Sequence, residues 1–192
     1  MHRKRLVEAA GAVALTVLLA GCGGEPGPKE TAPDANGAPS PSASSPSASA
    51  SSDPKTDEEQ AALAAYRGMW REQMAAYRKA SVKGTRLKEY AALNALSRIE
   101  LDVRRMKEAG TVATGDLGHE PVVAALDLEA KGGPTARITD CLDLADWAEE
   151  RDGKPLPLPS SQPTRYRATA EAQRWEGRWR ITEYTPEGNR TC

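Results

Sequence analysis

The segment YRATAEAQRWEGRWRITEY, residues 166–184, is the strongest secondary-structure signal in the chain. Apolar and polar side chains alternate on both sides of Glu176 and Gly177, so we expect two antiparallel strands, 166–175 and 178–184, joined by a two-residue turn. The face expected to be buried carries Tyr166, Ala168, Ala170, Ala172, Trp179 and Ile181. The turn sets these facing pairs: Arg174 with Trp179, Ala172 with Ile181, and Ala170 with Glu183. The C-terminal part of the chain is therefore predicted to form an antiparallel sheet.

Strand periodicity continues upstream of this hairpin. Residues 112–114 are expected to form a short strand, and the segments 121–129 and 135–145 are expected to pair as a second hairpin. Their inward faces are predicted to carry Ala124, Leu126 and Leu128, and Ile138, Leu142 and Leu144. Residues 149–163 contain four prolines, which cannot donate to a strand ladder, so this segment is predicted to be an irregular loop.

Two amphipathic helices are predicted before the strands. The first runs from a capping box at Thr56 to about residue 80, and the second runs from Thr85 to Ala109 and ends at Gly110. Their apolar stripes are Leu63, Tyr66, Trp70, Met74 and Tyr77, and Ala92, Leu96, Ile99, Val103 and Met106. Because neither helix buries its stripe alone, we expect an α+β domain, 56–192, in which both helices pack on an antiparallel sheet of four to five strands.

This order of elements, with Asp140-Cys141-Leu142-Asp143, Gly177-Arg178-Trp179-Arg180 and the terminal Cys192, resembles a bacterial group. The group consists of secreted and lipid-anchored proteins of high-GC Gram-positive bacteria with a nuclear transport factor 2-like (SnoaL-like) domain. The resemblance covers residues 57–192 and implies a cone, in which a curved sheet wraps around the long helices and leaves a pocket at the wide end. It implies no reaction.

The stretch Leu19-Ala20-Gly21-Cys22 resembles the bacterial lipobox. A basic start and a short apolar run, 9–20, precede it, as in an export signal. The resemblance implies that residues 1–21 are a cleaved lipoprotein signal peptide and that acyl chains such as palmitate on Cys22 hold the protein at the outer face of the cell membrane. The alternative is an ordinary secretory cleavage site and a free extracytoplasmic protein.

Residues 22–55 are predicted to be a disordered tether. Gly, Pro, Ala and Ser dominate this stretch, and it has too little apolar surface to offset the cost of ordering the backbone. The whole chain has a formal net charge of -1, and loss of residues 1–21 removes three basic and one acidic side chain. The composition thus offers no basic field that would attract nucleic acid.

Two cysteines remain once Cys22 is acylated. Cys141 lies on a predicted strand and Cys192 ends the sequence. Outside the cytoplasm such a pair is expected to form a disulfide, which would hold the C-terminal tail against the sheet. A redox-active pair is the less favoured alternative because the two cysteines lack the CxxC spacing.

Several aromatic side chains and one acidic group are candidates for the lining of a ligand pocket, although aromatic residues at helical or strand spacing more often belong to the core. The pocket candidates are Trp70, Tyr77, Asp140, Trp147, Tyr166 and Trp179. Asp140 shares the predicted inward face of its strand with Ile138 and Leu142, so a general base at this position is one hypothesis. The other is that Asp140 pairs with Arg174, Arg137 or a backbone donor.

No metal or cofactor site is predicted. His119 has no second His or Cys at ligand spacing and is interpreted as a solvated loop residue. Asp140, Asp143 and Asp146 alternate between strand faces and do not form a calcium loop. The sequence also lacks a phosphate-binding glycine loop, a GxSxG elbow and an HExxH helix.

These observations favour a non-catalytic, lipid-anchored protein whose tethered domain binds a partner or a small ligand at the cell envelope. The alternative is a small-molecule isomerase or cyclase with Asp140 as its base, because enzymes of the cone fold, such as ketosteroid isomerases and polyketide cyclases, use carboxylates in the pocket. A concave pocket that holds Asp140 beside a Tyr hydroxyl would favour the enzyme.

Overall fold

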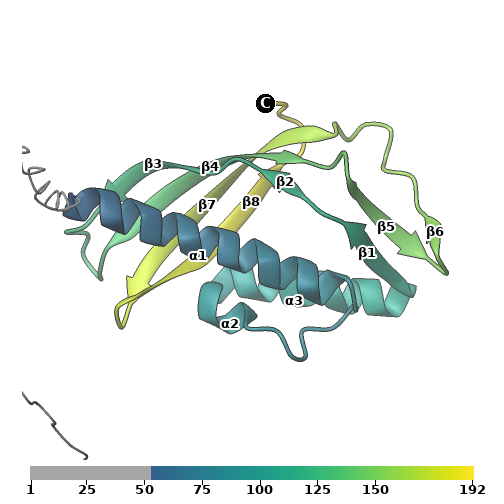
Figure 1. Cartoon of the computed structure of the whole chain (residues 1–192), viewed down its shortest axis with the longest axis horizontal. Helices are drawn as coiled ribbons and strands as arrows, with labels where there is room; N and C mark the ends of the chain where they lie inside the picture. The colour runs from purple at the N-terminus through teal and green to yellow at the C-terminus, as the bar shows by residue number, and fades with distance from the viewer. Residues whose placement is uncertain (1–52) are drawn as a thin grey trace, which may run out of the picture. The chain divides into compact units, whose positions relative to one another are not determined.

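The computed structural model describes residues 53–192 (Figure 1). The predicted signal peptide, Cys22 and nearly all of the predicted tether lie outside this range. The helices are α1 (Pro54–Tyr77), α2 (Leu87–Tyr90) and α3 (Leu93–Ala109). The strands are β1 (Thr111–Gly115), β2 (Gly118–His119), β3 (Val122–Asp127), β4 (Thr135–Asp143), β5 (Trp147–Arg151), β6 (Lys154–Pro155), β7 (Arg165–Trp175) and β8 (Arg178–Glu187). No helix in this part of the chain is long and apolar enough to cross a bilayer.

The main sheet is antiparallel and contains five strands. Its order is β2-β4-β7-β8, and β3 pairs with β4 on the same side as β2. Figure 1 shows α1 lying along this curled sheet, and the buried residues of α1, α3 and the sheet form one hydrophobic core. The fold therefore confirms the α+β class and the predicted antiparallel sheet with helices packed on it.

The β7–β8 hairpin follows its predicted register only near the turn. Arg174 faces Trp179 and Ala172 faces Ile181 as expected, but Glu171 then faces Glu183, so the predicted Ala170–Glu183 pair is wrong. A β-bulge at Thr182 adds one residue to β8 and reverses the faces beyond it. As a result Tyr184 turns into the core, and Glu183 accepts a hydrogen bond from Asn94 at 2.7 Å.

The edge formed by β2 and β3 is one strand with an interruption. Gly118 faces Asp143 and Val122 faces Thr139, so both segments share a register on β4, and the break falls at Glu120 and Pro121. Pro121 has no N–H to donate to the ladder. Beyond the break, a bulge at Ala124 corrects the predicted inward face of this strand, because Ala124 and Leu128 are exposed. The partly buried apolar residues there are Val123 and Leu126.

The helix boundaries also differ from the prediction. Asp53, and not Thr56, caps α1, because its carboxylate accepts a hydrogen bond from the Lys55 N–H at 3.0 Å and Pro54 supplies the first turn. The predicted second helix, 85–109, is two helices. Between them the backbone is extended at Ala91, which forms a parallel bridge to Ile181, so pairing with the edge of β8 interrupts the helix.

A second, three-stranded sheet of order β1-β5-β6 corrects the predicted loop at 149–163. Glu149–Arg151 pair with β1, and the chain then turns at Asp152 and Gly153 into β6. The irregular stretch begins only after Pro155, the last residue of β6. The prediction failed because the four prolines were taken to exclude a strand from the whole segment, whereas its first three residues belong to β5.

Candidate functional site

One cavity lies between α1, α3, the smaller sheet and the end of β8. Its volume is about 160 Å³. The lining residues are Trp70, Gln73, Met74, Tyr77, Arg98, Asp102, Leu117, Leu144, Trp147, Gln162, Tyr166, Tyr184 and Pro186. Aromatic side chains make much of the wall, and a small set of polar groups faces them, which is the usual composition of a ligand site. We refer to this cavity as the aromatic pocket.

A chain of hydrogen bonds fixes the polar side of the aromatic pocket. Tyr77 donates its hydroxyl hydrogen to Asp102 at 3.3 Å, and Gln73 donates from Nε2 to the Tyr77 hydroxyl oxygen at 2.9 Å. Burial, together with the Asp102 charge, raises the pKa of Tyr77 well above its ordinary value, so the hydroxyl stays protonated. The Tyr77 hydroxyl uses its only hydrogen in the bond to the Asp102 carboxylate, which can only accept. Its oxygen can therefore only accept from Gln73, so the Gln73 amide must turn its N–H₂ group, and not its oxygen, toward Tyr77.

Gln73 therefore presents an unused acceptor. The residue is 4% exposed, and its Oε1 has no hydrogen-bond partner within residues 53–192. A buried amide oxygen without a partner is costly, so the site favours a ligand that brings a hydrogen-bond donor. The sequence carried a signal for this residue, since Gln73 is a polar side chain on the apolar face of α1, three positions after Trp70 and four before Tyr77.

The structure brings together four of the six pocket candidates. Trp70, Tyr77, Trp147 and Tyr166 line the aromatic pocket, and Tyr184, which the register error had concealed, joins them. Trp70 and Tyr184 meet edge to face, with ring centroids 5.2 Å apart. Leu117, Gln162 and Arg98 come from loops and from α3, and no sequence pattern pointed to them.

Trp179 does not line the aromatic pocket. It packs near the N-terminal end of α1, where its Nε1 donates to Glu58 at 2.8 Å. Arg174 donates to the other oxygen of the same carboxylate at 2.6 Å. Glu58 thus holds the β7–β8 hairpin to the first turns of α1, and Trp179 belongs to the core.

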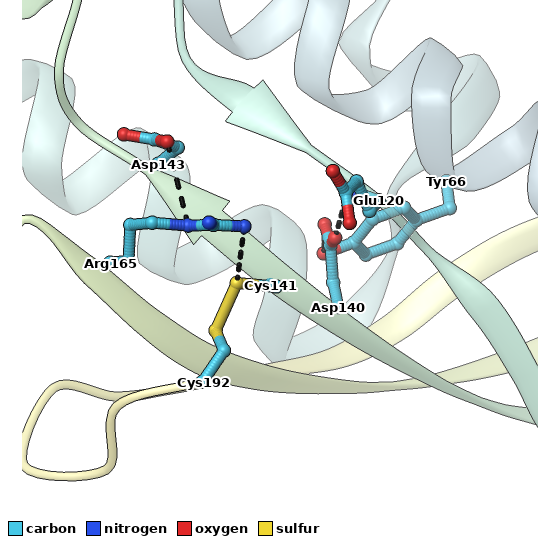
Figure 2. Close-up of a disulfide and its surroundings, with 7 residues drawn as sticks. All are labelled: Tyr66, Glu120, Asp140, Cys141, Asp143, Arg165 and Cys192. Atoms are coloured by element: carbon cyan, nitrogen blue, oxygen red, sulfur yellow. Dashed lines mark hydrogen bonds and ion pairs between the residues drawn. A yellow bond between two sulfur atoms is a disulfide. The ribbon is translucent and has the colours of Figure 1, made fainter.

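Asp140 is also absent from the aromatic pocket, although it does lie beside a Tyr hydroxyl. Its side chain is 1% exposed. Tyr66 donates to one carboxylate oxygen at 2.9 Å, and the Glu120 N–H donates to the other at 2.6 Å (Figure 2). Burial raises the pKa of Asp140 above its ordinary value, while these two hydrogen bonds act in the opposite direction.

The position of Asp140 explains why its partners are a backbone amide and a tyrosine. In the shared register of β2 and β3, Asp140 stands opposite Pro121, where the ladder has no donor. The carboxylate instead takes the Glu120 N–H and ties the interrupted edge to α1 through Tyr66. Of the predicted partners the backbone donor is present, whereas Arg174 pairs with Glu58 and Arg137 with Glu171.

His119 is not a solvated loop residue. It forms part of β2, its side chain is 23% exposed, and its Nδ1 lies 3.9 Å from an oxygen of Asp140. The ring also meets Tyr66 edge to face at 6.3 Å. The interpretation failed because Gly118 and Pro121 resembled a turn, whereas the segment is an edge strand. Residues 53–192 hold no group of three or more His, Cys, Asp or Glu side chains arranged for a metal ion.

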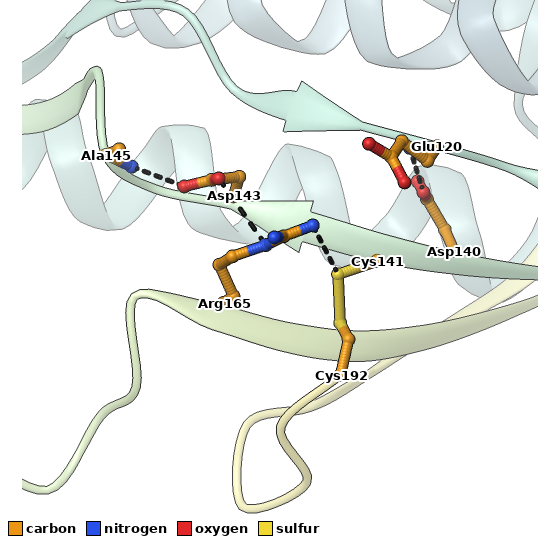
Figure 3. Close-up of polar contacts among 7 residues, drawn as sticks. All are labelled: Glu120, Asp140, Cys141, Asp143, Ala145, Arg165 and Cys192. Carbon is orange, nitrogen blue, oxygen red and sulfur yellow. Dashed lines mark hydrogen bonds and ion pairs between the residues drawn. A yellow bond between two sulfur atoms is a disulfide. The ribbon is translucent and has the colours of Figure 1, made fainter.

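Cys141 and Cys192 form a disulfide that closes the C-terminus onto β4 (Figure 2). The Arg167 N–H donates to the Arg190 carbonyl at 2.8 Å, so the tail lies beside β7 before it reaches Cys141. Arg165 donates to the Cys141 sulfur at 3.5 Å and pairs with Asp143, which in turn accepts from the Ala145 N–H at 2.9 Å (Figure 3). These contacts surround the bridge with structural partners.

Comparison with known proteins shows a distant similarity to solved structures. No family model and no curated protein matches the chain. Among solved structures, the intermembrane space region of chloroplast protein ARC6 is similar at 15% identity and a TM-score of 0.39. The match covers 71% of this chain and 97% of that chain. A likeness of this size supports no conclusion about the fold or the function.

Proposed function

We propose that this protein is a lipid-anchored, extracytoplasmic binding protein whose folded domain holds a small ligand in the aromatic pocket without catalysis. The observation that carries the proposal is the pocket itself, in which aromatic walls surround the free Gln73 acceptor. The lipobox resemblance of residues 19–22 supports the anchor. A protein partner at the envelope is the second kind of ligand that the sequence allows, but the small volume and aromatic lining of the pocket favour a small molecule.

The pocket volume and chemistry define the ligand class. A dry cavity of about 150 Å³ accepts a benzene ring, and the aromatic pocket measures about 160 Å³. An aromatic or compact apolar group with one hydroxyl or amine would fill the space and donate to Gln73. Phenol is therefore a suitable probe, and benzene is its matched control because it lacks the donor.

The alternative proposal, an isomerase or cyclase with Asp140 as base, has less support. The Asp140 side chain is 1% exposed and both of its oxygens accept short hydrogen bonds from Tyr66 and Glu120. A general base needs to reach the proton that it removes, and Asp140 does not line the aromatic pocket. Its contacts support a structural role.

We also propose that the domain is a nuclear transport factor 2-like cone. The five-stranded curled sheet, α1 along it and a pocket at the end of the sheet near β8 support this assignment. The interrupted edge strand and the additional β1-β5-β6 sheet are the features that a comparison with members of that fold should examine first.

Binding of phenol and benzene to wild type and two tryptophan variants tests the function. Trp147→Ala removes a wall of the aromatic pocket, whereas Trp175→Ala alters a half-buried tryptophan at the hairpin turn. We expect Trp147→Ala to lose phenol binding, measured by titration calorimetry, and Trp175→Ala to keep it. Wild type should bind phenol about three- to tenfold more tightly than benzene, and Gln73→Leu should remove this preference. Equal binding by both tryptophan variants would exclude the aromatic pocket as the site.

The anchor has its own test. Cys22→Ser removes the thiol that would be acylated, so the variant should leave the membrane pellet of fractionated cells, whereas Cys192→Ser should remain in it. Equal sedimentation of wild type and Cys22→Ser would contradict the lipid anchor and would leave the pocket proposal untouched.

A further inference from the structure

The charge of the folded domain is strongly uneven. Residues 53–192 carry 22 basic and 23 acidic side chains, which is nearly neutral. Residues 67–90 alone carry seven basic and two acidic side chains. The rest of residues 53–192 therefore carries 15 basic and 21 acidic side chains. The net charge of the chain, which argued against a basic field, conceals a positive segment at the C-terminal half of α1 and in the loop and helix that follow it.

The structure brings four of these cations together, and the other three neighbour them in the chain. Arg67, Arg71 and Arg78 share a face of α1 and line, with His119, a depression of about 210 Å³. The guanidinium groups of Arg71 and Arg86 both lie over the Tyr90 ring, at 5.4 Å and 6.0 Å from its centroid. We define the basic patch as Arg67, Arg71, Arg78, Lys79, Lys83, Arg86 and Lys88.

Three acidic groups lie within the basic patch and do not neutralise it. Glu72 is tucked beneath it with 11% of its side chain exposed, and it pairs with Arg71 and Arg86. Asp116 pairs with Arg78, and Glu89 lies 4.0 Å from Arg86. Seven cations therefore face three anions, and the side chains of Arg67, Lys83 and Lys88 have no ion pair within residues 53–192.

We infer that the basic patch docks the domain onto the phosphate headgroups of an anionic bilayer, with the depression between Arg67, Arg71 and Arg78 as the point of closest contact. Arginine forks match phosphate oxygens, and clustered cations near a bilayer add their attraction to an anionic surface. Trp70, Met74 and Leu117 line both this depression and the aromatic pocket. Docking would therefore hold the pocket close to the bilayer.

The length of the chain permits this orientation. Cys22 and Asp53 are 31 residues apart, and an extended chain of that length reaches about 100 Å. The 24 residues of α1 span roughly 36 Å, so the far end of α1 can meet the surface to which Cys22 is proposed to be anchored. This geometric step rests on the proposed anchor, whereas the charge of the patch does not.

The test measures docking without any acyl chain. Residues 23–192 contain every described helix and strand and the disulfide, so this chain carries the folded domain without Cys22. Sedimentation with phosphatidylglycerol–phosphatidylcholine vesicles would compare wild type, Arg67→Glu/Lys83→Glu and a control on α3, Arg104→Glu/Lys107→Glu. Both double variants change the net charge equally, and near-ultraviolet circular dichroism verifies that each is folded.

We expect the patch variant to bind at least about tenfold more weakly than wild type and the α3 control to bind within about twofold of it. Wild-type binding should disappear in about 1 M salt, where charges are screened within about 3 Å. His119 is the only histidine in residues 23–192, so its imidazole NMR signals should shift on binding to small bicelles of the same lipids. Equal loss in both double variants, or equal binding to pure phosphatidylcholine, would overturn the inference. So would binding to soluble polyphosphate or inorganic phosphate without binding to vesicles.

Discussion

The two ends of α1 place aromatic side chains against the sheet in different ways. At the N-terminal end, Glu58 accepts from both Arg174 and Trp179, and Trp179 is buried in the hydrophobic core. At the C-terminal end, Gln73 keeps a free acceptor and the aromatic residues enclose space. Aromatic residues at helical spacing therefore do not by themselves define a pocket.

The partner segments account for the difference. The N-terminal end of α1 meets the part of the β7–β8 hairpin near its turn, where Arg174 faces Trp179 and both side chains donate to Glu58. The C-terminal end meets Leu117, Trp147 and Gln162, which come from a short linker, the smaller sheet and a proline-rich loop. Irregular segments hold the walls apart where a continuous sheet would close on them.

Loss of the disulfide should lower the free energy of unfolding more than any other change, and it should affect the regions at both ends of α1. Cys141 and Cys192 are 51 residues apart, and a loop of that length is worth roughly 4 kcal/mol on the chain-entropy model. We expect Cys192→Ser to lower the free energy of unfolding, measured by urea titration, by roughly 4 kcal/mol. A reductant should destabilise wild type by the same amount and should not affect the variant, which has no disulfide. Phenol affinity should not change. An unchanged urea midpoint would show that the bridge does not stabilise the fold.

Glu58→Ala should give the next largest loss in the free energy of unfolding, and it acts at the N-terminal end of α1. It removes the acceptor of Arg174 and Trp179, and the loss should be about 1–2 kcal/mol because Glu58 and Arg174 keep some contact with water. Glu59→Ala, at a half-buried position of the same turn, is the control and should be nearly neutral. Chemical unfolding monitored by fluorescence measures both. A larger loss for the control would contradict the role of Glu58.

Gln73→Leu should have a smaller effect at the hollow end. The change removes one hydrogen bond to Tyr77 but also removes a buried acceptor without a partner, so the cost should stay below about 1 kcal/mol. The same unfolding experiment measures it. A cost larger than that of Glu58→Ala would show that Gln73 is fully satisfied in the folded protein and would remove the reason for a donor on the ligand.

The smallest effect concerns Asp140 on β4, which accepts a hydrogen bond from Tyr66 midway along α1. Burial raises the folded-state pKa of its carboxyl above the ordinary value of 3.8. Asp140 therefore stabilises the folded state fully when the pH is below the pKa that this carboxyl has in the unfolded chain. The contribution is lost as the pH rises through the higher pKa that it has in the folded protein. Urea titrations give the free energy of unfolding of wild type and of Asp140→Asn at each pH. We expect the difference, wild type minus variant, to fall as the pH rises from about 4 toward 7. A difference that rises with pH would contradict the raised pKa.

Much of the candidate site followed from the sequence, and two of the errors share one cause. The helical stripe placed Trp70 and Tyr77 together, and the alternation in β4 placed Asp140 on the inner face. Bulges at Thr182 and Ala124 shifted later side chains to the opposite face, so Tyr184 was not expected in the pocket. A bulge depends on how two strands meet, and neither strand encodes it locally.

The sequence by itself determined the α+β class, the two hairpins of the main sheet and the positions of the cysteines that pair, because alternation, turns and cysteine number are local properties. The tertiary structure alone decided which aromatic residues line a cavity, that Asp140 is buried beside Tyr66, and that Arg86 joins the arginines of α1 over the Tyr90 ring. These features depend on distances between segments far apart in the chain, and a linear pattern contains no such distances.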